Sequence, residues 1–599
     1  MTKHPLPATA ELHHPVPYRP EPASTVIRRR FRRGGERPRG VVWFGVTSFW
    51  GHLRHFLAAA IATEDVDSRD WMTPDTPREL LRLVVDRLGG DTKAPTLLEA
   101  LRRDVWIDFI ADTGDDVAVS RAVARLLFAP YELPDPDQAG GFLVAPRGEL
   151  LIFGGDTAYP VATAQEITNR VLVPFNQVLD ALPPDPTPRV LLGIPGNHDW
   201  YDGLDGFARM FRRREGGDDA PASRTGVSTL MLQNYAEWAR EFVRGGKIEK
   251  PKALVLRGYA PVQNASYFAL PASPAIELLA VDRQLRTPDS RQRSFLIDAY
   301  EAHPARATWA LLPDPVYRFG GASNSGTAMV ESLHFDLGAR DHFVLTGDIH
   351  HYARMQRGRL LHVIAGGGGA FLHPPRIAKG GLVAERAWPD PAQCKPLLRG
   401  VPWKIALGRS GFLPHLLLLA LFTPAVTFGM RAWERHHVIV SMPIAVTLLL
   451  TTILALIGGV RRRPSVLPFA FVAAAFVALF PVFFSYGVGR LLAELALTTP
   501  TTVVACLTLA AAVLAGTWVF GAFLTLLTRL GYEHTQAFTA LDHPGYKHFV
   551  RLRLRADGRG IDGYCLGLAD PCAKDQVPVL VDTFQWRPVT GAARGAPLR

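Results

Sequence analysis

The order of hydrophobic and polar positions divides the chain into two kinds of region. Between residues 40 and 390, short apolar runs alternate with stretches in which apolar residues recur every three or four positions. Short runs are typical of buried strands and periodic stretches of helices, so their alternation predicts an α/β domain. The predicted strands are Val105–Ala111, Leu150–Phe153, Val190–Ile194, Ile276–Val281, Thr308–Leu312 and His342–Leu345. The predicted helices are Ala162–Leu182, Ser228–Val243 and Arg291–Ala302, with another that begins after Thr76 and ends at Gly89.

A second kind of pattern runs from residue 411 to residue 530. Four apolar segments lie there, and none contains Asp, Glu, Lys or Arg. Each is about 20 residues or longer, which is enough for a helix to cross the hydrocarbon core of a membrane. We therefore expect four transmembrane helices, at Gly411–Met430, Val438–Val460, Pro464–Gly489 and Thr501–Thr528.

The remaining stretches show neither pattern. Residues 1–39 are rich in Pro, His and Arg and lack an apolar run, which predicts a disordered basic tail and no secretory signal peptide. Residues 391–410 form a connector, and residues 531–599 return to soluble character. Within this C-terminal region, His548–Arg555 and Gly563–Leu568 could form a β-hairpin.

Basic side chains flank the apolar segments unevenly. Lys and Arg beside membrane spans gather on the cytoplasmic side, so the richer side should be cytoplasmic. The expected protein is therefore a multi-pass protein of the cell membrane, with its N-terminal domain and its C-terminus both in the cytoplasm. The richer side carries Arg399, Lys404, Arg409, Arg461, Arg462, Arg463 and Arg529, and the other carries Arg431, Arg435 and Arg490.

The overall charge and the cysteines add little to this picture. The formal net charge is +11, and part of it comes from the basic run between Arg28 and Arg33. Such a run is a solvated tail or a contact with anionic lipid. No recognition motif accompanies it, so no nucleic-acid partner is expected. The four cysteines are scattered and form no disulfide framework, which suits a reducing compartment.

Three of the predicted strands end in glycine followed by residues that can bind metal ions. The clusters are Gly155-Asp156 with Tyr159, Gly196-Asn197-His198-Asp199, and Gly347-Asp348-Ile349-His350. Open α/β sheets place their sites at the carboxyl ends of strands, where glycine lets the backbone turn sharply. Carboxylate, amide and imidazole ligands together suit Mn, Fe or Zn better than Ca.

The order and spelling of these clusters resemble the calcineurin-like metallophosphoesterase superfamily, over roughly residues 105–375. In that family five blocks follow five strands. The three clusters match the second, third and fifth blocks, and Ala111-Asp112-Thr113-Gly114 stands where the first belongs. The spelling is closest to the purple acid phosphatase branch, through Asp112–Gly114, Gly155–Tyr159 and His350–Arg354.

The resemblance implies a four-layer α/β/β/α sandwich and hydrolysis of a phosphate ester by metal-activated water. One or two ions of Mn, Fe, Zn or Mg would be bound. The implied ligands are Asp112, Asp156, Tyr159 and His350 for the first ion, and Asp156, Asn197 and Asp348 for the second. The implied catalytic residues are His198, which would face the substrate phosphate, and Asp199 beside it.

Two departures from the family pattern affect the second ion. Pro313 stands where the fourth block supplies a histidine, and Asp348 stands where the fifth block begins Gly-His. The second ion is therefore weaker, harder in its ligand preference, or absent, and Asp314 and His351 are further candidate ligands. His373, in the turn-rich stretch after Gly366–Gly369, either packs structurally or supports the site.

These departures leave two functional hypotheses. The first is a membrane-anchored phosphoesterase. The second is a catalytically impaired relative that senses a metal or a phosphorylated ligand at the membrane. A transporter is disfavoured, because the apolar segments hold only His415 as an ionisable residue. The sequence leaves open the substrate and the oligomeric state.

Overall fold

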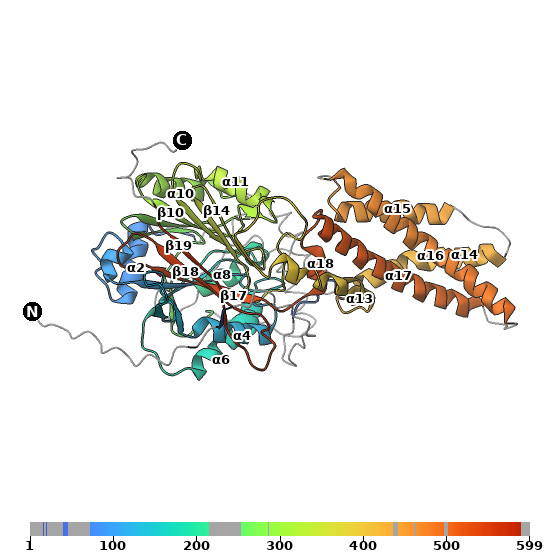
Figure 1. Ribbon diagram of the computed structural model, residues 1–599, viewed down its shortest axis with the longest axis horizontal. Coiled ribbons are helices and arrows are strands. Elements are labelled where there is room, and N and C mark those ends of the chain that lie inside the picture. The colour runs from blue at the N-terminus through green and yellow to red at the C-terminus, as the bar shows by residue number, and fades with distance from the viewer. Residues whose placement is uncertain are drawn as a thin grey trace, which may run out of the picture.

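The computed structural model describes residues 16, 19–20, 40–45, 72–214, 253–284, 287–434, 441–460, 463–495 and 501–588. It consists of a mixed α/β body and an elongated set of helices that extends from one end of that body (Figure 1). An α/β domain with an apolar helical region was predicted, and this level of the prediction is confirmed. The expected helix Ser228–Val243 and nearly all of the expected tail, residues 1–39, lie outside the described residues.

Two large sheets form the centre of the body. The first has eight strands in the order β1-β19-β18-β17-β2-β5-β6-β7, and the second has seven in the order β16-β14-β15-β13-β10-β9-β8. The strands of the first sheet are β1 (Arg19–Pro20), β19 (Val579–Trp586), β18 (Ile561–Leu568), β17 (Lys547–Leu554), β2 (Val105–Ile110), β5 (Leu150–Phe153), β6 (Arg189–Gly193) and β7 (Tyr259–Pro261). Those of the second are β16 (Arg386–Trp388), β14 (Tyr352–Arg357), β15 (Leu360–Ala365), β13 (His342–Thr346), β10 (Ala307–Leu312), β9 (Ile276–Ala280) and β8 (Phe268–Ser273). Two small hairpins, β3 (Tyr131–Pro134) with β4 (Phe142–Ala145) and β11 (Tyr317–Arg318) with β12 (Gly321–Ala322), complete the strands.

The two sheets pack face to face, with helices on their outer faces. Buried side chains that alternate along β2, such as Ile107 and Phe109, meet Trp309 and Phe343 of the second sheet in one core. A second core lies between the first sheet and α4 (Val117–Phe128), α5 (Ala164–Ile167), the π-helix η1 (Thr168–Leu172), α6 (Val173–Ala181) and α8 (Asp205–Phe211). A third core lies between the second sheet and α10 (Ser290–Ala302) and α11 (Asn324–Ser332). Helices α2 (Pro77–Leu88) and α3 (Leu97–Leu101) join the core between the sheets.

Parallel strands bring the predicted clusters to one edge. In the first sheet, β2 runs parallel to β5 and β5 to β6. In the second sheet, β9, β10, β13 and β15 are likewise parallel neighbours. The carboxyl ends of parallel strands point the same way, so the loops after these strands can share one site.

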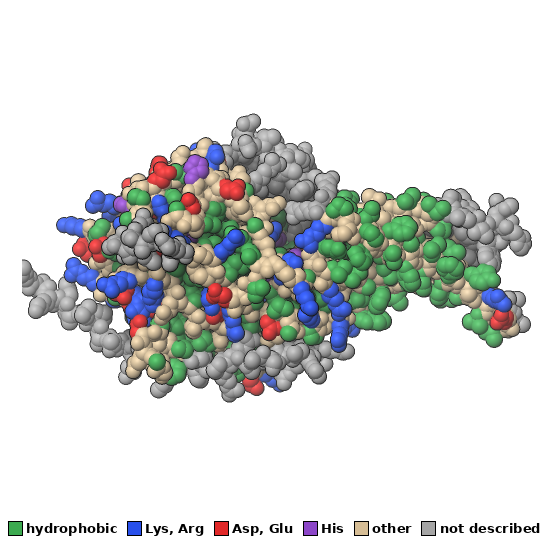
Figure 2. Space-filling view, turned by 45° about the horizontal axis from the view of Figure 1, so that its top comes forward, with side chains coloured by type: hydrophobic (Ala, Val, Ile, Leu, Met, Phe, Trp, Pro, Cys, Tyr) green, Lys and Arg blue, Asp and Glu red, His purple; other side chains and the backbone are tan. Residues whose placement is uncertain are grey.

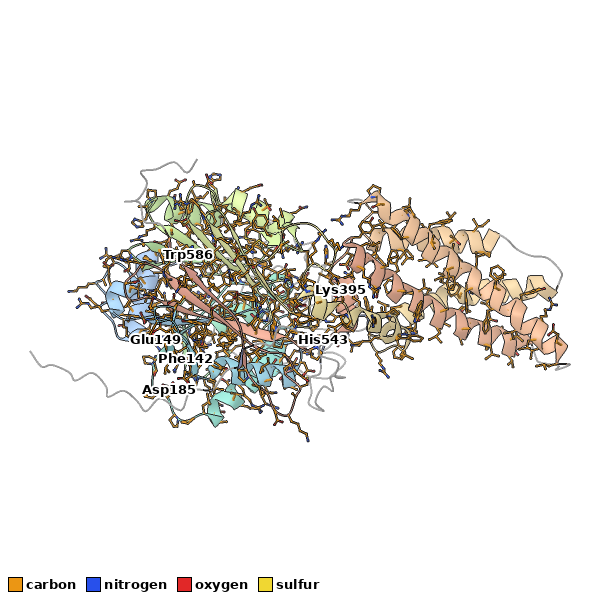
Figure 3. All side chains as sticks on the ribbon, viewed as in Figure 1. Phe142, Glu149, Asp185, Lys395, His543 and Trp586 are labelled. Atoms are coloured by element: carbon orange, nitrogen blue, oxygen red, sulfur yellow. The ribbon has the colours of Figure 1, made fainter. Side chains whose placement is uncertain are left out.

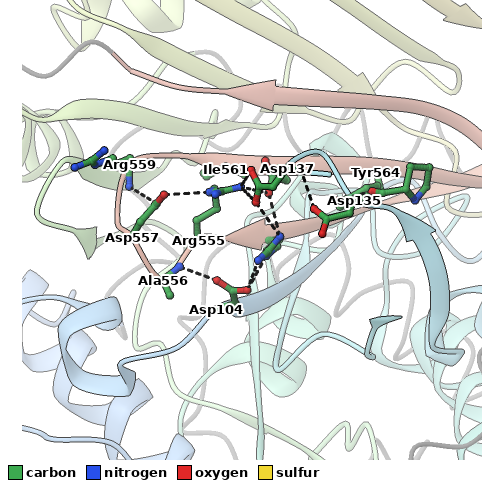
Figure 4. Close-up of polar contacts among 12 residues, drawn as sticks. Asp104, Asp135, Asp137, Arg555, Ala556, Asp557, Arg559, Ile561 and Tyr564 are labelled. Atoms are coloured by element: carbon green, nitrogen blue, oxygen red, sulfur yellow. Dashed lines mark hydrogen bonds and ion pairs between the residues drawn. The ribbon is translucent and has the colours of Figure 1, made fainter. Parts of the chain in front are cut away.

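The C-terminal residues complete the first sheet. Strands β17 and β18 correspond to the hairpin expected in this region, and β17 also pairs antiparallel with β2. Arg551 of β17 pairs with Asp108 of β2 at 2.7 Å, and neither side chain is exposed to solvent. Around the hairpin turn, Arg553 contacts Asp104 and Arg555 contacts Asp137, each at 2.7 Å (Figure 4). The chain therefore leaves the body after β16 of the second sheet and returns to it in the first sheet.

The helical region contains α14 (Leu413–Glu434), α15 (Ser441–Ile457), α16 (Leu467–Glu494) and α17 (Thr501–Leu530). Only two of the described helices are long and apolar enough to cross a membrane, Pro464–Leu492 and Thr502–Leu530, each of 29 residues. The prediction of four spans is corrected to this extent. The 17 residues of α15 reach roughly 25 Å, less than the ~30 Å hydrocarbon core.

Apolar side chains cover the outside of this helical region. Figure 2 shows a nearly continuous hydrophobic surface over the helices, whereas charged residues spread over the body. Phe483 and Val472 of α16 are 68% and 67% exposed. Water-soluble proteins rarely leave so large an apolar surface uncovered, because exposed apolar area is costly. This surface and the two long helices indicate association with a membrane.

Short helices join the two regions. These are α12 (Pro391–Cys394), the 3₁₀ helices η2 (Leu397–Gly400) and η3 (Pro464–Val466), α13 (Val401–Ala406) and α18 (Gln536–Leu541). Lys395 and His543 lie at this junction (Figure 3). Lys404 donates to the carbonyl of Leu541, and the Ser410 hydroxyl donates to that of Ala540 at 2.6 Å. The expected connector, 391–410, is thus folded against the start of the C-terminal region.

Candidate active site

Three aspartates at the ends of parallel strands share an unusual backbone conformation. Asp112 after β2, Asp156 after β5 and Asp348 after β13 have φ angles of 59°, 50° and 67°. This left-handed region costs an L-residue roughly 1–2 kcal/mol, although Asp tolerates it better than most. The same strain at three strand ends of one edge marks these loops as functional candidates.

Four of the predicted site residues converge on one point. The Tyr159 hydroxyl lies 2.9 Å from Asp112 Oδ1, 3.2 Å from Asp156 Oδ2 and 3.1 Å from His350 Nε2. His350 Nε2 lies 3.4 Å from Asp112 Oδ1. All four side chains are buried. The structure thus brings the four residues together from the ends of β2, β5 and β13.

Around the Tyr159 hydroxyl there are more hydrogen-bond acceptors than donors. His350 Nδ1 lies 2.7 Å from the carbonyl of Phe371, which can only accept, so Nδ1 carries the proton and a neutral ring presents a lone pair at Nε2. A tyrosine hydroxyl has one hydrogen. When both carboxylates are ionised, their two oxygens and one imidazole nitrogen face the single hydroxyl proton of Tyr159, an arrangement that a cation would satisfy.

The distances also fit one metal ion. Ligands bound at about 2.1 Å to the same ion stand roughly 3 Å from one another, as the Tyr159 hydroxyl does from the other three atoms. Asp112 Oδ2 is buried without a hydrogen-bond partner among the described residues. Those residues contain no metal-type group made of three or more His, Cys, Asp or Glu side chains alone. The present group depends on Tyr159 as its centre.

Burial makes the group unfavourable without added positive charge. The pKa of Asp156 is raised well above its usual value by burial and by the nearby charges of Asp112 and Asp199. The pKa of Tyr159 is also raised, by burial and then by Asp112 and Asp156. A bound cation would favour the ionised forms and reverse both effects.

Close packing holds these side chains in place. A Cβ atom on Gly366 would lie 2.5 Å from Asp112 Oδ2, and one on Gly196 would lie 2.2 Å from Asp156 Oδ1, so only glycine fits beside either carboxylate. The His373 ring stacks on the His350 ring with centroids 3.9 Å apart, and His373 Nδ1 accepts from the His350 backbone N–H at 3.3 Å. His373 therefore positions His350.

The cluster Gly196-Asn197-His198-Asp199 begins a short helix, α7 (Asn197–Trp200), beside this group. The His198 backbone N–H donates to Asp156 Oδ1 at 2.8 Å, and His198 Nδ1 lies 2.7 Å from the carbonyl of Pro160. The His198 ring packs on Tyr159 with centroids 4.4 Å apart. Asn197 donates through Nδ2 to the Tyr201 hydroxyl at 3.1 Å.

Asp199 has a different place from the one expected beside the His198 ring. Its carboxylate accepts the backbone N–H of Gly196 at 2.9 Å and that of Thr157 at 3.3 Å. Burial raises the pKa of Asp199 to about 6, although these N–H groups lower it. Asp199 therefore joins the loops after β5 and β6, which is a positioning role.

The loops of the second sheet present carboxylates that are paired with arginine. Asp314 accepts from Arg283 Nη1 at 2.9 Å, and Asp348 Oδ2 accepts from Arg318 Nη1 at 3.3 Å. Burial and Asp314 raise the pKa of Asp348 to about 7, although Arg318 and Arg283 lower it. His351 is buried and faces Phe319, with ring centroids 6.2 Å apart.

The sequence analysis missed several residues of the site. Arg283 lies directly after strand β9, just as the predicted site residues lie directly after their strands. Its position in the sequence could therefore have indicated a site residue. Trp43 gave none, because it lies far away in sequence. Its ring nevertheless packs against Tyr159, His198 and Phe371, with centroids 5.8, 6.0 and 5.1 Å apart.

Comparison with known proteins gives little beyond this geometry. No protein-family model and no curated protein matches the chain. A solved structure described as GAP50, the anchor in the inner membrane complex of Plasmodium, is 8% identical with a TM-score of 0.28, and the match covers 48% of this chain and 77% of that one. The structure of PhoD is 10% identical with a TM-score of 0.22, covering 45% of this chain and 58% of that one. Such low scores establish no common fold, so the functional case rests on the site itself.

Proposed function

We propose that this protein is a metal-dependent phosphoesterase with a metallophosphoesterase sandwich, anchored in a membrane by its apolar helices. The observation that carries the proposal is the convergence of Asp112, Asp156, Tyr159 and His350 on one point that has a single hydrogen. Two anionic oxygens, an imidazole and a phenol oxygen suit a transition metal. The order of these residues along the chain is the order of the family blocks they resemble.

The residues around this point have separable roles in the proposed reaction. Asp112, Asp156, Tyr159 and His350 would hold the ion, which when bound polarises a phosphoryl oxygen and lowers the pKa of water. His198 is committed to Pro160 through Nδ1, so Nε2 is the atom that would carry a proton to the leaving oxygen. Asn197 would align the phosphate beside it.

The chain path supports the same side of the membrane for both parts of the body. Strand β17, which follows the helical region, pairs with β2, which precedes it. The number of membrane crossings between them must therefore be even. Together with the excess of Lys and Arg at the junction, this supports a cytoplasmic body.

A sensor without turnover is the second candidate. It is favoured by one observation, the arginine pairing of Asp314 and Asp348 where the family binds a second ion. Such a protein would bind metal or phosphate at the membrane surface and hydrolyse nothing.

Phosphoester turnover separates the two candidates. The full-length protein, purified in detergent, would be assayed on aryl phosphate monoesters and diesters with Mn, Fe, Zn or Mg. We expect metal-dependent turnover that His198→Ala removes. Turnover no higher than that of His198→Ala with every metal would replace the enzyme by the sensor.

A further inference from the structure

We propose that Arg283 and Arg318 take the place of the second metal ion, so that the site holds one ion and binds phosphoryl oxygens with guanidinium groups. This proposal rests on the proposed function and adds the residues that recognise the substrate. Its starting point is the local sequence. In the family pattern two histidines serve the second ion. Here Pro313 stands at one of these positions and offers no side-chain ligand, and Asp348 stands at the other.

The two carboxylates beside the expected second ion, Asp314 and Asp348, already have cationic partners. Arg283, in the loop after β9, reaches Asp314 after β10 at 2.9 Å. Arg318, in β11, reaches Asp348 after β13 at 3.3 Å. A second metal ion would have to displace both guanidinium groups or share the space with their positive charge, and like charges at short range repel. The donor set therefore does not fit a second ion.

The charge around Arg283 extends to the first half of the site. Burial lowers the pKa of Arg283, but the charges of Asp314, Asp348 and Asp156 outweigh it and raise the pKa. Asp156 is the carboxylate that the family shares between its two ions. The Arg283 guanidinium thus interacts electrostatically with Asp156, the carboxylate on which a second ion would depend.

The two arginines also have capacity for a ligand. Arg283 Nε is buried without a hydrogen-bond partner among the described residues. The Arg318 side chain is 35% exposed, and it also lines a separate cavity of about 300 Å³ that none of the four converging residues lines. Guanidinium groups bind phosphate oxygens through two parallel N–H donors, and a carboxylate behind each group would fix its orientation. Phosphate esters can therefore reach Arg318 from solvent, whereas the Arg283 side chain is less exposed, at 20%.

The chain offers two matched controls. Arg359 pairs with Asp341 at 3.0 Å and is 36% exposed, close to the values for Arg318 with Asp348. Arg306 pairs with Glu277 and is 15% exposed, against 20% for Arg283. Both control pairs belong to the same sheet but lie at the opposite ends of its strands, because Arg306 precedes β10 and Arg359 precedes β15.

The first test is the metal content of the full-length protein after equilibration with excess Mn²⁺ and removal of free metal. We expect one ion per chain. Two ions per chain would overturn this proposal and leave the proposed function intact. A protein that binds no ion would overturn both.

The second test is the affinity of the metal-loaded protein for inorganic phosphate, measured by calorimetry. Arg318→Gln and Arg283→Gln should each weaken binding roughly 10- to 100-fold, the usual loss for a hydrogen bond to a charged group. Arg359→Gln and Arg306→Gln should bind as the unchanged protein does. Arg318→Lys, which keeps the charge but loses the paired donors, guards against a glutamine variant that fails to fold, and it should also weaken binding. Unchanged affinity in Arg318→Lys and in every folded variant of this pair would overturn the proposal.

Discussion

The two halves of the site carry similar acidic residues but balance their charge in different ways. In the first half, Asp112 and Asp156 converge on Tyr159 and His350, and within the described chain neither carboxylate pairs with lysine or arginine. In the second half, Asp314 and Asp348 each pair with an arginine. In this proposal, acidic residues at strand ends do not by themselves define a metal site. What decides is whether the protein supplies its own cation.

Removal of a ligand from the first half should have the largest effect. His350→Ala deletes the nitrogen that faces Tyr159, and no neighbouring cation can replace the lost interaction. Loss of outer partners of metal ligands already costs about 10- to 100-fold in metal affinity. We therefore expect His350→Ala to lower metal affinity at least ~100-fold and to reduce turnover to the background rate. Elemental analysis and the phosphoester assay would measure both.

A buried histidine away from the site provides the control for that variant. His362 is fully buried in β15, and its Nε2 accepts the Val316 backbone N–H at 3.1 Å. His362→Gln should keep the metal. Equal metal loss in both variants would mean that His350 acts through the fold rather than as a ligand.

His198→Ala separates chemistry from metal binding in the first half. General acid catalysis contributes roughly 10²–10⁴-fold to rate, and turnover should fall by that factor. The metal content should stay at the level of the unchanged protein, because none of the four converging atoms belongs to His198. A variant that lost its ion as well would show that His198 organises the first half.

A buried arginine–aspartate pair away from the site tests whether pairing alone explains the second half. Arg551 and Asp108 are fully buried between β17 and β2, away from the strand ends of the site. Arg551→Met leaves a buried charge without its partner, which should lower the free energy of unfolding by about 3–5 kcal/mol. Denaturant unfolding would measure this loss. The phosphate affinity of the folded fraction should not change. A decrease like that of Arg318→Gln would mean that the arginines of the site do not differ from Arg551 in binding phosphate.

The pH dependence of stability should be smaller and should come from buried histidines outside the site. Burial lowers the pKa of His342 to about 4, below its ordinary value of 6.5. Between these two pKa values His342 is protonated in the unfolded chain and neutral in the folded chain. Stability is therefore lost as pH falls from about 6.5 towards 4. His342→Phe should reduce the loss by up to ~3 kcal/mol. An unchanged pH profile would show that His342 contributes nothing to it.

The sequence predicted the parts of the fold whose signals are local. Strands β2, β5, β6, β10 and β13 are buried parallel strands, which read as continuous apolar runs, and their ends carried recognisable glycine and ligand residues. The pairing of β17 with β2 joins residues more than 400 positions apart and has no local signal. The length of only one apolar helix was overestimated: α15 ends at Ile457, because apolar composition continues into the turn Gly458–Val460.

The site was predictable to a similar degree. Asp112, Asp156, Tyr159 and His350 were found from their spelling and strand context, and the structure brings them together. Asp199 was expected as a catalytic residue beside His198, and its carboxylate accepts backbone N–H groups of two loops, which the sequence did not indicate. The arginine partners of Asp314 and Asp348 could not be assigned, since a pair between separate loops depends on how the strands are ordered in the sheet.

The most direct test of this account is X-ray diffraction at the metal absorption edge, from crystals of the full-length protein grown with Mn²⁺. We predict one anomalous peak, within bonding distance of Asp112, Asp156, Tyr159 and His350, with Arg283 and Arg318 still beside Asp314 and Asp348. A second peak between Asp156 and Asp348, or the absence of a peak beside Tyr159, would contradict it.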